Sequence, residues 1–344
     1  MTMPASITET GGDANHRRSA SEHPASPVDG GVVACLDTSW LSHKVIPHAA
    51  AIAHALHASL TLLHVLEVAP KTDVPLDPFE WDVRRRSAHD YIRRLASERG
   101  DETFHIDTIV VEGQPAEQIC LWARNQKVGL IAVGTHGDSG AADWALGETA
   151  RKLVETCSGA LLLVPSSVSD ADVVHYRRLL VPLDGSSRAE SVLALATRLA
   201  REQDAELLLT HIIPVPELTE IGPLEVEDIK LKDAVIRRNE RVARQYLERI
   251  RARIAEQGLA VNVILRDGDV RGSLSRLAVE EAADLVIMSA HGRGDRADVS
   301  CGSIASFLVT HTATPLLIVL RGSGAGSSAS TEKSDGRPPG RAVL

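Results

Sequence analysis

The residues of this chain that are best suited to chemistry occur twice, in the same order and at nearly the same spacing. Each half carries an aspartate directly after a short apolar run, at Asp37 and again at Asp184. Each half also carries a later loop of small residues that precedes a helical segment. Its spacing is G-x2-G-x9-G in the first half and S-x2-G-x9-G-S in the second. The loop positions are Gly134, Gly137 and Gly147, then Ser289, Gly292, Gly302 and Ser303.

Phosphate binding is the chemistry that this loop favours. A glycine after a strand lets the backbone approach a phosphate with no Cβ in the way. A helix that begins there offers free N–H groups and the positive end of its dipole. Ser303 adds a hydroxyl donor in the second half, whereas Glu148 holds the matching position of the first half and would repel a phosphate at close range. We expect the second half to be the better nucleotide site, with Ser289 in place of the first glycine as its smaller defect.

Four aspartates near these loops each allow two interpretations. Asp295 and Asp298 lie inside the second loop, where they could hold a divalent ion or discourage a phosphate. Asp37 and Asp184 could contact a ligand, or they could do no more than cap the helix that follows. The sequence leaves both alternatives open.

The histidines do not complete a catalytic or metal site. His136 and His291 lie in the two loops, but no repeated nucleophile or second carboxylate accompanies them, so we do not expect an enzyme. Other histidines gather near the first helical segment without counterparts in the second half, and we expect no metal site there. These are His43, His48, His54 and His57.

A constant offset relates the two halves and indicates a duplication. The offset is 147 residues from Asp37 to Asp184 (184 − 37), and it becomes 155 residues from Gly147 to Gly302 (302 − 147). The second copy therefore carries eight extra residues (155 − 147), placed between its second and third strands. The pairs His64 and His211, and Leu161 and Leu316, keep these two offsets.

Short apolar runs alternate with amphipathic segments of helical period in each copy, which predicts right-handed crossovers and a doubly wound sheet. We predict an α/β protein of two tandem, Rossmann-like domains, each with a five-stranded parallel sheet. In the long charged segment of the second copy, Val235, Val242, Tyr246, Ile250 and Ile254 are spaced as the buried stripe of a helix. The predicted organisation is a first domain at 31–165, a linker at 166–176, a second domain at 177–320, and disordered tails at 1–30 and 321–344.

Composition indicates which binding partners are unsuited to the chain and which cellular compartment it fits. The formal net charge of −9 argues against nucleic acids and anionic membranes as partners, because their phosphates would repel the chain. No apolar run reaches the ~18 residues of a spanning helix, and residues 1–30 lack the apolar segment of a signal peptide. The cysteines form no CxxC pair, so we expect reduced thiols in a cytoplasmic protein. They are Cys35, Cys120, Cys157 and Cys301.

These motifs, taken together, resemble those of the universal stress proteins over nearly all of residues 31–320. The resemblance implies an adenine-nucleotide alpha hydrolase-like fold and an ATP-binding loop, which Mg²⁺ could accompany. It also implies that the aspartate after the first strand and a hydrophobic residue after the second strand frame the nucleoside. For the second copy it assigns Pro182, Leu183, Asp184, Ile212, Met288, Ser289, Gly292, Gly302, Ser303 and Ile304 to the nucleotide. The less complete set of the first copy is Asp37, Val65, Gly134, Gly137 and Gly147, opposed by Glu148.

Two functions of different class follow from the sequence. The first is a stress-response protein that binds ATP in its second copy. The alternative is an interaction scaffold whose sheets associate through their last strands while both pockets are vestigial. The short linker predicts that the two copies pack together as an intramolecular pseudo-dimer, and a homodimer of whole chains is a further level of assembly open to it. Slow ATP hydrolysis is a third option that no identified water-activating group supports.

Overall fold

The computed structural model describes residues 30–67, 77–100, 104–136, 146–216, 225–293 and 301–320. Apart from Gly30, the tails predicted to be disordered lie outside these ranges, and so do Gly137, Asp295 and Asp298 of the two loops. Within the described ranges, no helix has both the length and the apolar character needed to cross a membrane.

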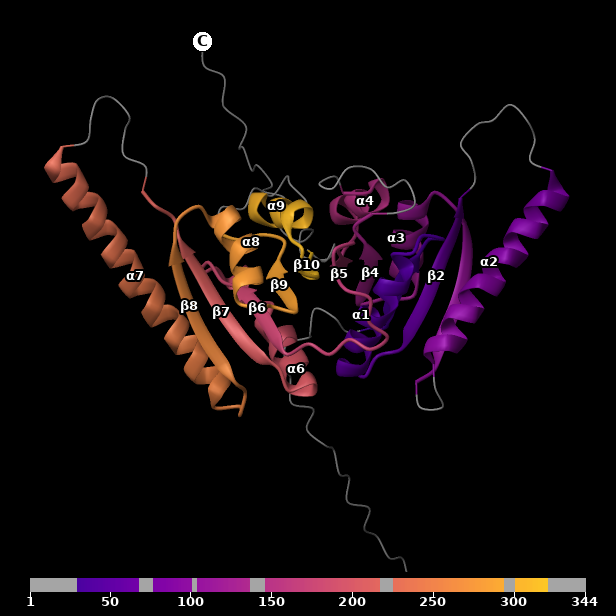
Figure 1. Ribbon diagram of the computed structural model, residues 1–344, viewed down its shortest axis with the longest axis horizontal. Coiled ribbons are helices and arrows are strands. Elements are labelled where there is room, and N and C mark those ends of the chain that lie inside the picture. Colours follow the sequence, from indigo (N-terminus) through magenta and orange to yellow (C-terminus); the bar gives the residue numbers. More distant parts are fainter. Residues whose placement is uncertain are drawn as a thin grey trace, which may run out of the picture.

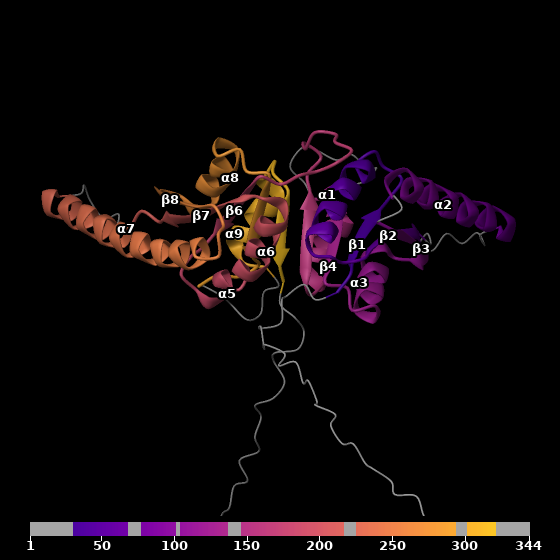
Figure 2. The ribbon, with the colours of Figure 1, turned by 90° about the horizontal axis from the view of Figure 1, so that it is seen from below.

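The first copy is a five-stranded parallel sheet between two layers of helices. Its strands, in the spatial order β3-β2-β1-β4-β5, are β1 (Val32–Leu36), β2 (Leu60–Glu67), β3 (Ile106–Gly113), β4 (Leu130–Gly134) and β5 (Ala160–Val164). Its helices are α1 (Ser42–Ala55), α2 (Pro78–Arg99), α3 (Pro115–Asn125) and α4 (Glu148–Thr156). Helices α1 and α2 cover one face of the sheet, and α3 and α4 cover the other (Figures 1 and 2).

The second copy repeats this arrangement in the order β10-β9-β6-β7-β8. Its strands are β6 (Arg178–Pro182), β7 (Glu206–Ile213), β8 (Val261–Asp267), β9 (Leu285–Ser289) and β10 (Leu316–Val319). Its helices are α5 (Ser187–Glu190), α6 (Leu193–Gln203), α7 (Val226–Ala255), α8 (Val270–Glu280) and α9 (Ser303–His311). The segment that matches α1 is thus two helices, α5 and α6. The prediction of two doubly wound, five-stranded parallel sheets is confirmed.

The two copies join through their last strands. Strand β5 pairs with β10 in antiparallel register, with Leu162 opposite Leu317 and Leu161 opposite Ile318, which produces a single ten-stranded sheet. These residues are buried, because α1, α4, α6 and α9 cover both faces of the junction (Figure 1). Each of the two hydrophobic cores, one on either side of the sheet, contains residues of both copies. The predicted pseudo-dimer is therefore a continuous sheet with continuous cores.

Polar side chains fasten the linker between the copies. The hydroxyl of Tyr176, at the end of the linker, lies 2.9 Å from Nδ1 of His48 in α1. Gln203 of α6 accepts a hydrogen bond from the backbone N–H of Tyr176 and donates one to the carbonyl of Ala51 in α1. Lys44, another buried residue of α1, donates to two linker carbonyls. The linker is thus part of the interface between the copies.

The cysteines depart from the expectation of reduced thiols. Cys120 of α3 and Cys157, directly after α4, form a disulfide, whereas Cys35 and Cys301 are free. The expectation was wrong for this pair because the two cysteines are 37 residues apart in sequence and only the packing of α3 against α4 brings them together. In the second copy the matching helices are linked by a hydrogen bond, from the Ser275 hydroxyl to the His311 carbonyl, at 2.9 Å.

His48 predicts a loss of stability in mild acid. Burial lowers the pKa of His48 from 6.5 to about 4, so the unfolded chain binds a proton there at a higher pH than the folded chain does. The free energy of unfolding should therefore fall as the pH drops from about 6.5 to about 4, with about 2 kcal/mol lost between pH 7 and pH 5. Urea titrations across this range measure it. A His48→Leu variant should show a shallower slope, and an unchanged slope would contradict the assignment to His48.

Reduction of the disulfide should destabilise the protein. A cross-link that closes a loop of this length restricts the unfolded chain and contributes about 2–4 kcal/mol to the free energy of unfolding. Urea unfolding with and without dithiothreitol measures the loss. A double variant, Cys120→Ala with Cys157→Ala, should be as unstable as the reduced protein and indifferent to the reductant. Equal stability of the oxidised and reduced protein would contradict the prediction.

Candidate functional site

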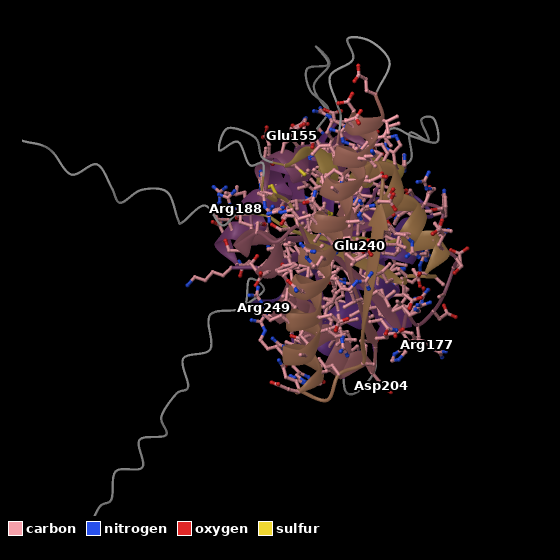
Figure 3. All side chains as sticks on the ribbon, turned by 90° about the vertical axis from the view of Figure 1, so that its left-hand side faces the viewer. Glu155, Arg177, Arg188, Asp204, Glu240 and Arg249 are labelled. Carbon is pink, nitrogen blue, oxygen red and sulfur yellow. A yellow bond between two sulfur atoms is a disulfide. The ribbon has the colours of Figure 1, made fainter. Side chains whose placement is uncertain are left out.

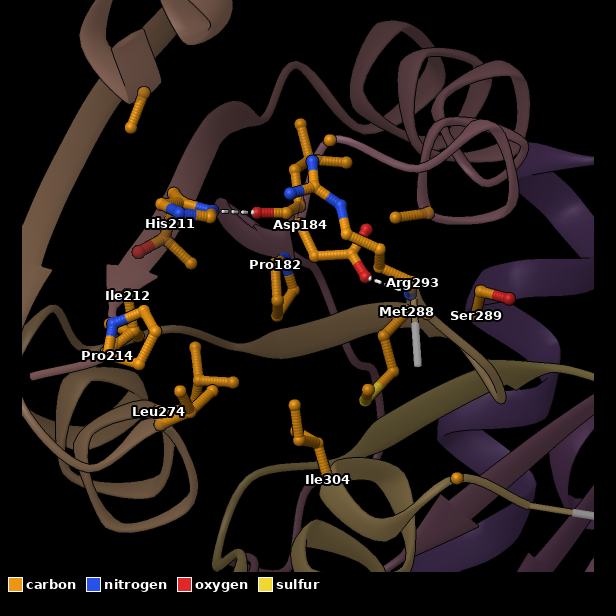
Figure 4. Close-up of a pocket in the computed structure, with 18 of the residues that line it drawn as sticks. Pro182, Asp184, His211, Ile212, Pro214, Leu274, Met288, Ser289, Arg293 and Ile304 are labelled. Carbon is orange, nitrogen blue, oxygen red and sulfur yellow. Dashed lines mark hydrogen bonds between the residues drawn. The ribbon is translucent and has the colours of Figure 1, made fainter. Parts of the chain in front are cut away.

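A pocket of about 1040 Å³ opens in the second copy at the carboxyl ends of β6, β7 and β9. Its size lies at the upper end of the range typical of small-molecule sites, and parallel α/β sheets bind ligands at this edge. In Figure 4, Ile212 and Leu274 lie on one side of the pocket and Met288 and Ile304 on the other. All ten residues predicted for this copy line it: Pro182, Leu183, Asp184, Ile212, Met288, Ser289, Gly292, Gly302, Ser303 and Ile304.

Asp184 ties two loops of the pocket together. Its Oδ1 accepts a hydrogen bond from the N–H of Ser186 at 2.9 Å. Its Oδ2 accepts one from the N–H of Arg293 at 2.6 Å (Figure 4). Burial alone would raise the pKa of Asp184, but these hydrogen bonds and the charge of Arg293 together lower it below its usual value. Asp184 is therefore an ionised carboxylate at neutral pH. The cap of α5 is the Ser186 side chain, which accepts from Ala189 N–H, so Asp184 is not a helix cap.

Gly292 is required by this contact. A Cβ at position 292 would overlap Oδ2 of Asp184, so any other residue would have to displace the carboxylate from its hydrogen bonds. Gly185, which follows Asp184, has a φ of +80°, and a Cβ there would lie 2.6 Å from the Arg293 guanidinium. Gly185 and Gly292 thus both permit the close contact between the two loops.

Helix α9 begins at the edge of the pocket. Its N-cap is Gly302, which has no side chain to cap the first N–H groups, and Ser303 is exposed in the first turn. The N–H of Gly302 donates to the carbonyl of Ala290 at 2.8 Å, so the helix start is fixed to the end of β9. The Ser289 side chain points away from the centre of the pocket (Figure 4).

His211 has a structural role that its repetition in the sequence did not explain. Its Nδ1 lies 2.6 Å from the carbonyl oxygen of Leu183, and in the first copy Nδ1 of His64 lies 2.9 Å from the carbonyl of Leu36. A carbonyl oxygen only accepts, so Nδ1 must carry the proton. In each copy this hydrogen bond holds the strand end that presents the aspartate.

Helix α7 forms a wall of the pocket that the sequence did not predict. Its buried residues are Ala243, Leu247, Ile250 and Ile254, whereas Val242 is 49% exposed and lines the pocket with Tyr246. The predicted buried stripe was therefore wrong at Val242, which faces the pocket and not the sheet. Burial raises the pKa of the Tyr246 phenol. Charged side chains such as Glu240 and Arg249 extend from the rest of the helix surface (Figure 3).

Comparison with known proteins identifies the family to which this architecture belongs. The model of the universal stress protein family matches the chain twice, at residues 31–165 and 175–319. The chain belongs to the universal stress protein family. The two matches correspond to the two halves of the ten-stranded sheet.

The family's known members include proteins with the same tandem length. A universal stress protein of Mycolicibacterium smegmatis is 24% identical over 304 residues, covering 86% of this chain and 98% of that protein. A universal stress protein of Synechocystis is 26% identical over 150 residues, covering 42% of this chain and 97% of that protein. The crystal structure of a universal stress protein from Archaeoglobus fulgidus has a TM-score of 0.59 at 18% identity, covering 86% of this chain and 99% of that one. This likeness shows the shared fold.

The first copy of this universal stress protein uses its matching positions differently. Gly134, at the end of β4, faces the buried side chain of Leu41, and a Cβ on Gly134 would lie 2.6 Å from Cδ2 of Leu41. The glycine therefore makes room for a core side chain. Residue 188, which matches Leu41 in the second copy, is an exposed arginine.

The acidic residues of the first copy are also engaged locally. Asp37 Oδ1 accepts hydrogen bonds from the N–H of Ser39 at 3.0 Å and from the hydroxyl of Ser42 at 3.0 Å. Glu148, in the first turn of α4, turns outward to Lys152 at 2.8 Å, and that hydrogen bond and charge lower its pKa. The remaining members of the predicted first-copy set lie at matching places: Val65 in β2 and Gly147 as the N-cap of α4.

Gly292→Ala should destabilise the second copy. The added methyl group displaces the Asp184 carboxylate from its hydrogen bond with Arg293, and overpacking of this kind costs about 1–3 kcal/mol. Urea unfolding measures the loss. In an Asp184→Ala background the same substitution should cost much less, because the group it collides with has gone. An equal cost in both backgrounds would show that Gly292 is needed for another reason.

Proposed function

We propose that this universal stress protein binds ATP in the pocket of its second copy, as part of a stress response. The phosphates lie at the start of α9, where the N–H groups beyond Gly302 and the Ser303 hydroxyl are available to an anion. The base extends toward Pro182, Ile212 and Met288, and Asp184 lies beside the ribose. The observation that carries this proposal is the uncapped start of α9 at the edge of the pocket.

The contrast between the copies supports the choice of the second. In the first copy Leu41 fills the space over Gly134, and Glu148 adds a negative charge to the first turn of α4. An anion near that helix start meets repulsion. At the same position of α9 stands Ser303, a neutral donor. We therefore propose one nucleotide site per chain.

Magnesium would enter with the nucleotide. Among the described residues, no three histidine, cysteine, aspartate or glutamate side chains gather into a metal site, and Mg²⁺ in proteins is commonly held by substrate phosphates with one or two carboxylates. Asp184 is a carboxylate of the pocket that fits this role. We propose a binding function rather than turnover, in the cytoplasm, where the Cys120–Cys157 pair would be open to reduction.

The scaffold alternative expects sheets that associate through their last strands. Strands β5 and β10 do pair with each other within the chain, so this pairing does not separate the two functions. A homodimer of whole chains would need a different surface. The second pocket argues against this alternative, because it is open and lined by the residues that the resemblance assigns to the nucleotide.

A charge placed at the start of α9 should abolish ATP binding. Ser303→Glu copies Glu148 of the first copy, and Ser303 is exposed, so the fold should tolerate it. We expect ATP at about 100 times its Kd to stabilise the wild-type protein by about 2.7 kcal/mol and to leave Ser303→Glu unchanged. Thermal shift with MgATP on the full chain measures both.

Two controls accompany this test. Ser303→Gln has the same length as the glutamate without its charge and should retain part of the stabilisation. Gly147→Ala, in the first copy, should retain all of it. Absence of stabilisation in the wild-type protein at millimolar MgATP would refute the proposed function, and loss of it in Gly147→Ala alone would move the site to the first copy.

A further inference from the structure

Thr210 is a polar residue of β7 that lies between Leu209 and His211. Its side chain is fully buried at 0% exposure, and its hydroxyl oxygen has no hydrogen-bond partner among the residues that the structure describes. Burial of an unpaired hydroxyl opposes folding, because the group loses its hydrogen bonds to water and gains none in return. A residue of this kind calls for a ligand that supplies the missing partner.

The register of the sheet directs the Thr210 side chain to the pocket. Thr210 is opposite Pro182 of β6 and Ile264 of β8, and residues in register on parallel strands project from the same face. Ile212, two residues further along β7, projects from that face as well. It belongs with Met288 to the core beneath α8 and α9. Thr210, Pro182, Ile212 and Met288 all line the pocket.

The first copy lacks this hydroxyl. At the offset of 147 residues, Thr210 corresponds to Leu63 (210 − 63), which is fully buried in the same core on the first-copy side. The unpaired hydroxyl therefore occurs in the copy whose uncapped helix start carries the neutral Ser303, and not in the copy whose helix start carries Glu148. Thr210 and the start of α9 both line one pocket, so one ligand could contact both.

We propose that Thr210 is a specificity-determining residue of this pocket, whose hydroxyl hydrogen-bonds the polar edge of the adenine base. This inference rests on the proposed function. The apolar side chains of Pro182, Ile212 and Met288 can pack against any flat ring, so they give affinity with little selectivity. A buried hydroxyl rejects a ligand that leaves it unpaired. Thr210 thereby selects a purine that presents a ring nitrogen or an exocyclic amino group at this place.

Thr210→Val tests the proposal, because valine has nearly the same shape and no hydroxyl. Isothermal titration of the full chain with MgATP should show a Kd raised about tenfold, and Thr210→Ser should stay within about threefold of wild type. Inorganic tripolyphosphate, which has no base, should bind both proteins equally. The melting temperature of Thr210→Val without ligand should equal or exceed that of wild type, since the unpaired hydroxyl is gone. If the Thr210 hydroxyl instead stabilises the fold, the melting temperature of Thr210→Val without ligand should fall below that of wild type.

A second measurement does not depend on the folding of the variant. ATP analogues that lack, one at a time, the exocyclic amino group or a ring nitrogen are titrated into the wild-type protein. The analogue that lacks the hydrogen-bonding partner of Thr210 should bind wild type about tenfold more weakly than ATP does. In Thr210→Val that analogue and ATP should bind with equal affinity. Equal affinity for ATP and every analogue would overturn the proposal while leaving the proposed function in place. If wild type binds no ATP at all, both are refuted.

Discussion

The pairing of β5 with β10 is the interaction on which the rest of the structure depends. A parallel sheet built of βαβ units ends in a strand with one free edge, and here both last strands are apolar on both faces. At a water-exposed edge either strand would offer its backbone groups, beside exposed leucines, to the strands of other chains. Their antiparallel pairing satisfies both edges at once. The two cores and the fastened linker then follow from this junction, because they extend across it.

Within the shared sheet the two copies keep the same backbone contacts in their loops but differ in the side chains around them. The backbone contacts that set each loop are the same: Gly147 donates to the Thr135 carbonyl and Gly302 to the Ala290 carbonyl, each at 2.8 Å. The side chains around them differ. Leu41 turns the first copy's loop into part of a packed core, whereas the second copy keeps an open pocket with an ionised aspartate at its edge. The open pocket and the carboxylate at its edge thus belong to the second copy.

Much of this arrangement could be predicted from the sequence, because it is encoded locally. Apolar runs and helical periods predict the strands and helices, and the two offsets place Asp184 and the glycine loop at the same edge of one sheet. Contacts between distant residues were not accessible in this way. The disulfide depends on how α3 packs on α4, and the role of Gly134 depends on a leucine from another loop.

Helix α7 shows the same limit, because the sequence gives its period but not the angle at which it meets the sheet. The spacing of Val242 and Tyr246 fits a buried stripe and fits a pocket wall equally well. Only the packing of Leu247 and Ile250 against the sheet decides between them. Thr210 was missed for a different reason. Threonine is common in strands, and an unpaired hydroxyl is recognisable only when its neighbours are known.

Fusion of the two sheets also changes how the protein meets other copies of itself in a crowded solution. Of the strands that the structure describes, only β3 and β8 remain at the outer edges of the sheet. Both carry exposed charges there, Asp107 and Glu112 on one and Arg266 and Asp267 on the other. Charged side chains on edge strands discourage sheets from pairing with one another edge to edge. By enclosing the apolar strands β5 and β10 and leaving the charged strands outermost, the chain gains protection against uncontrolled aggregation.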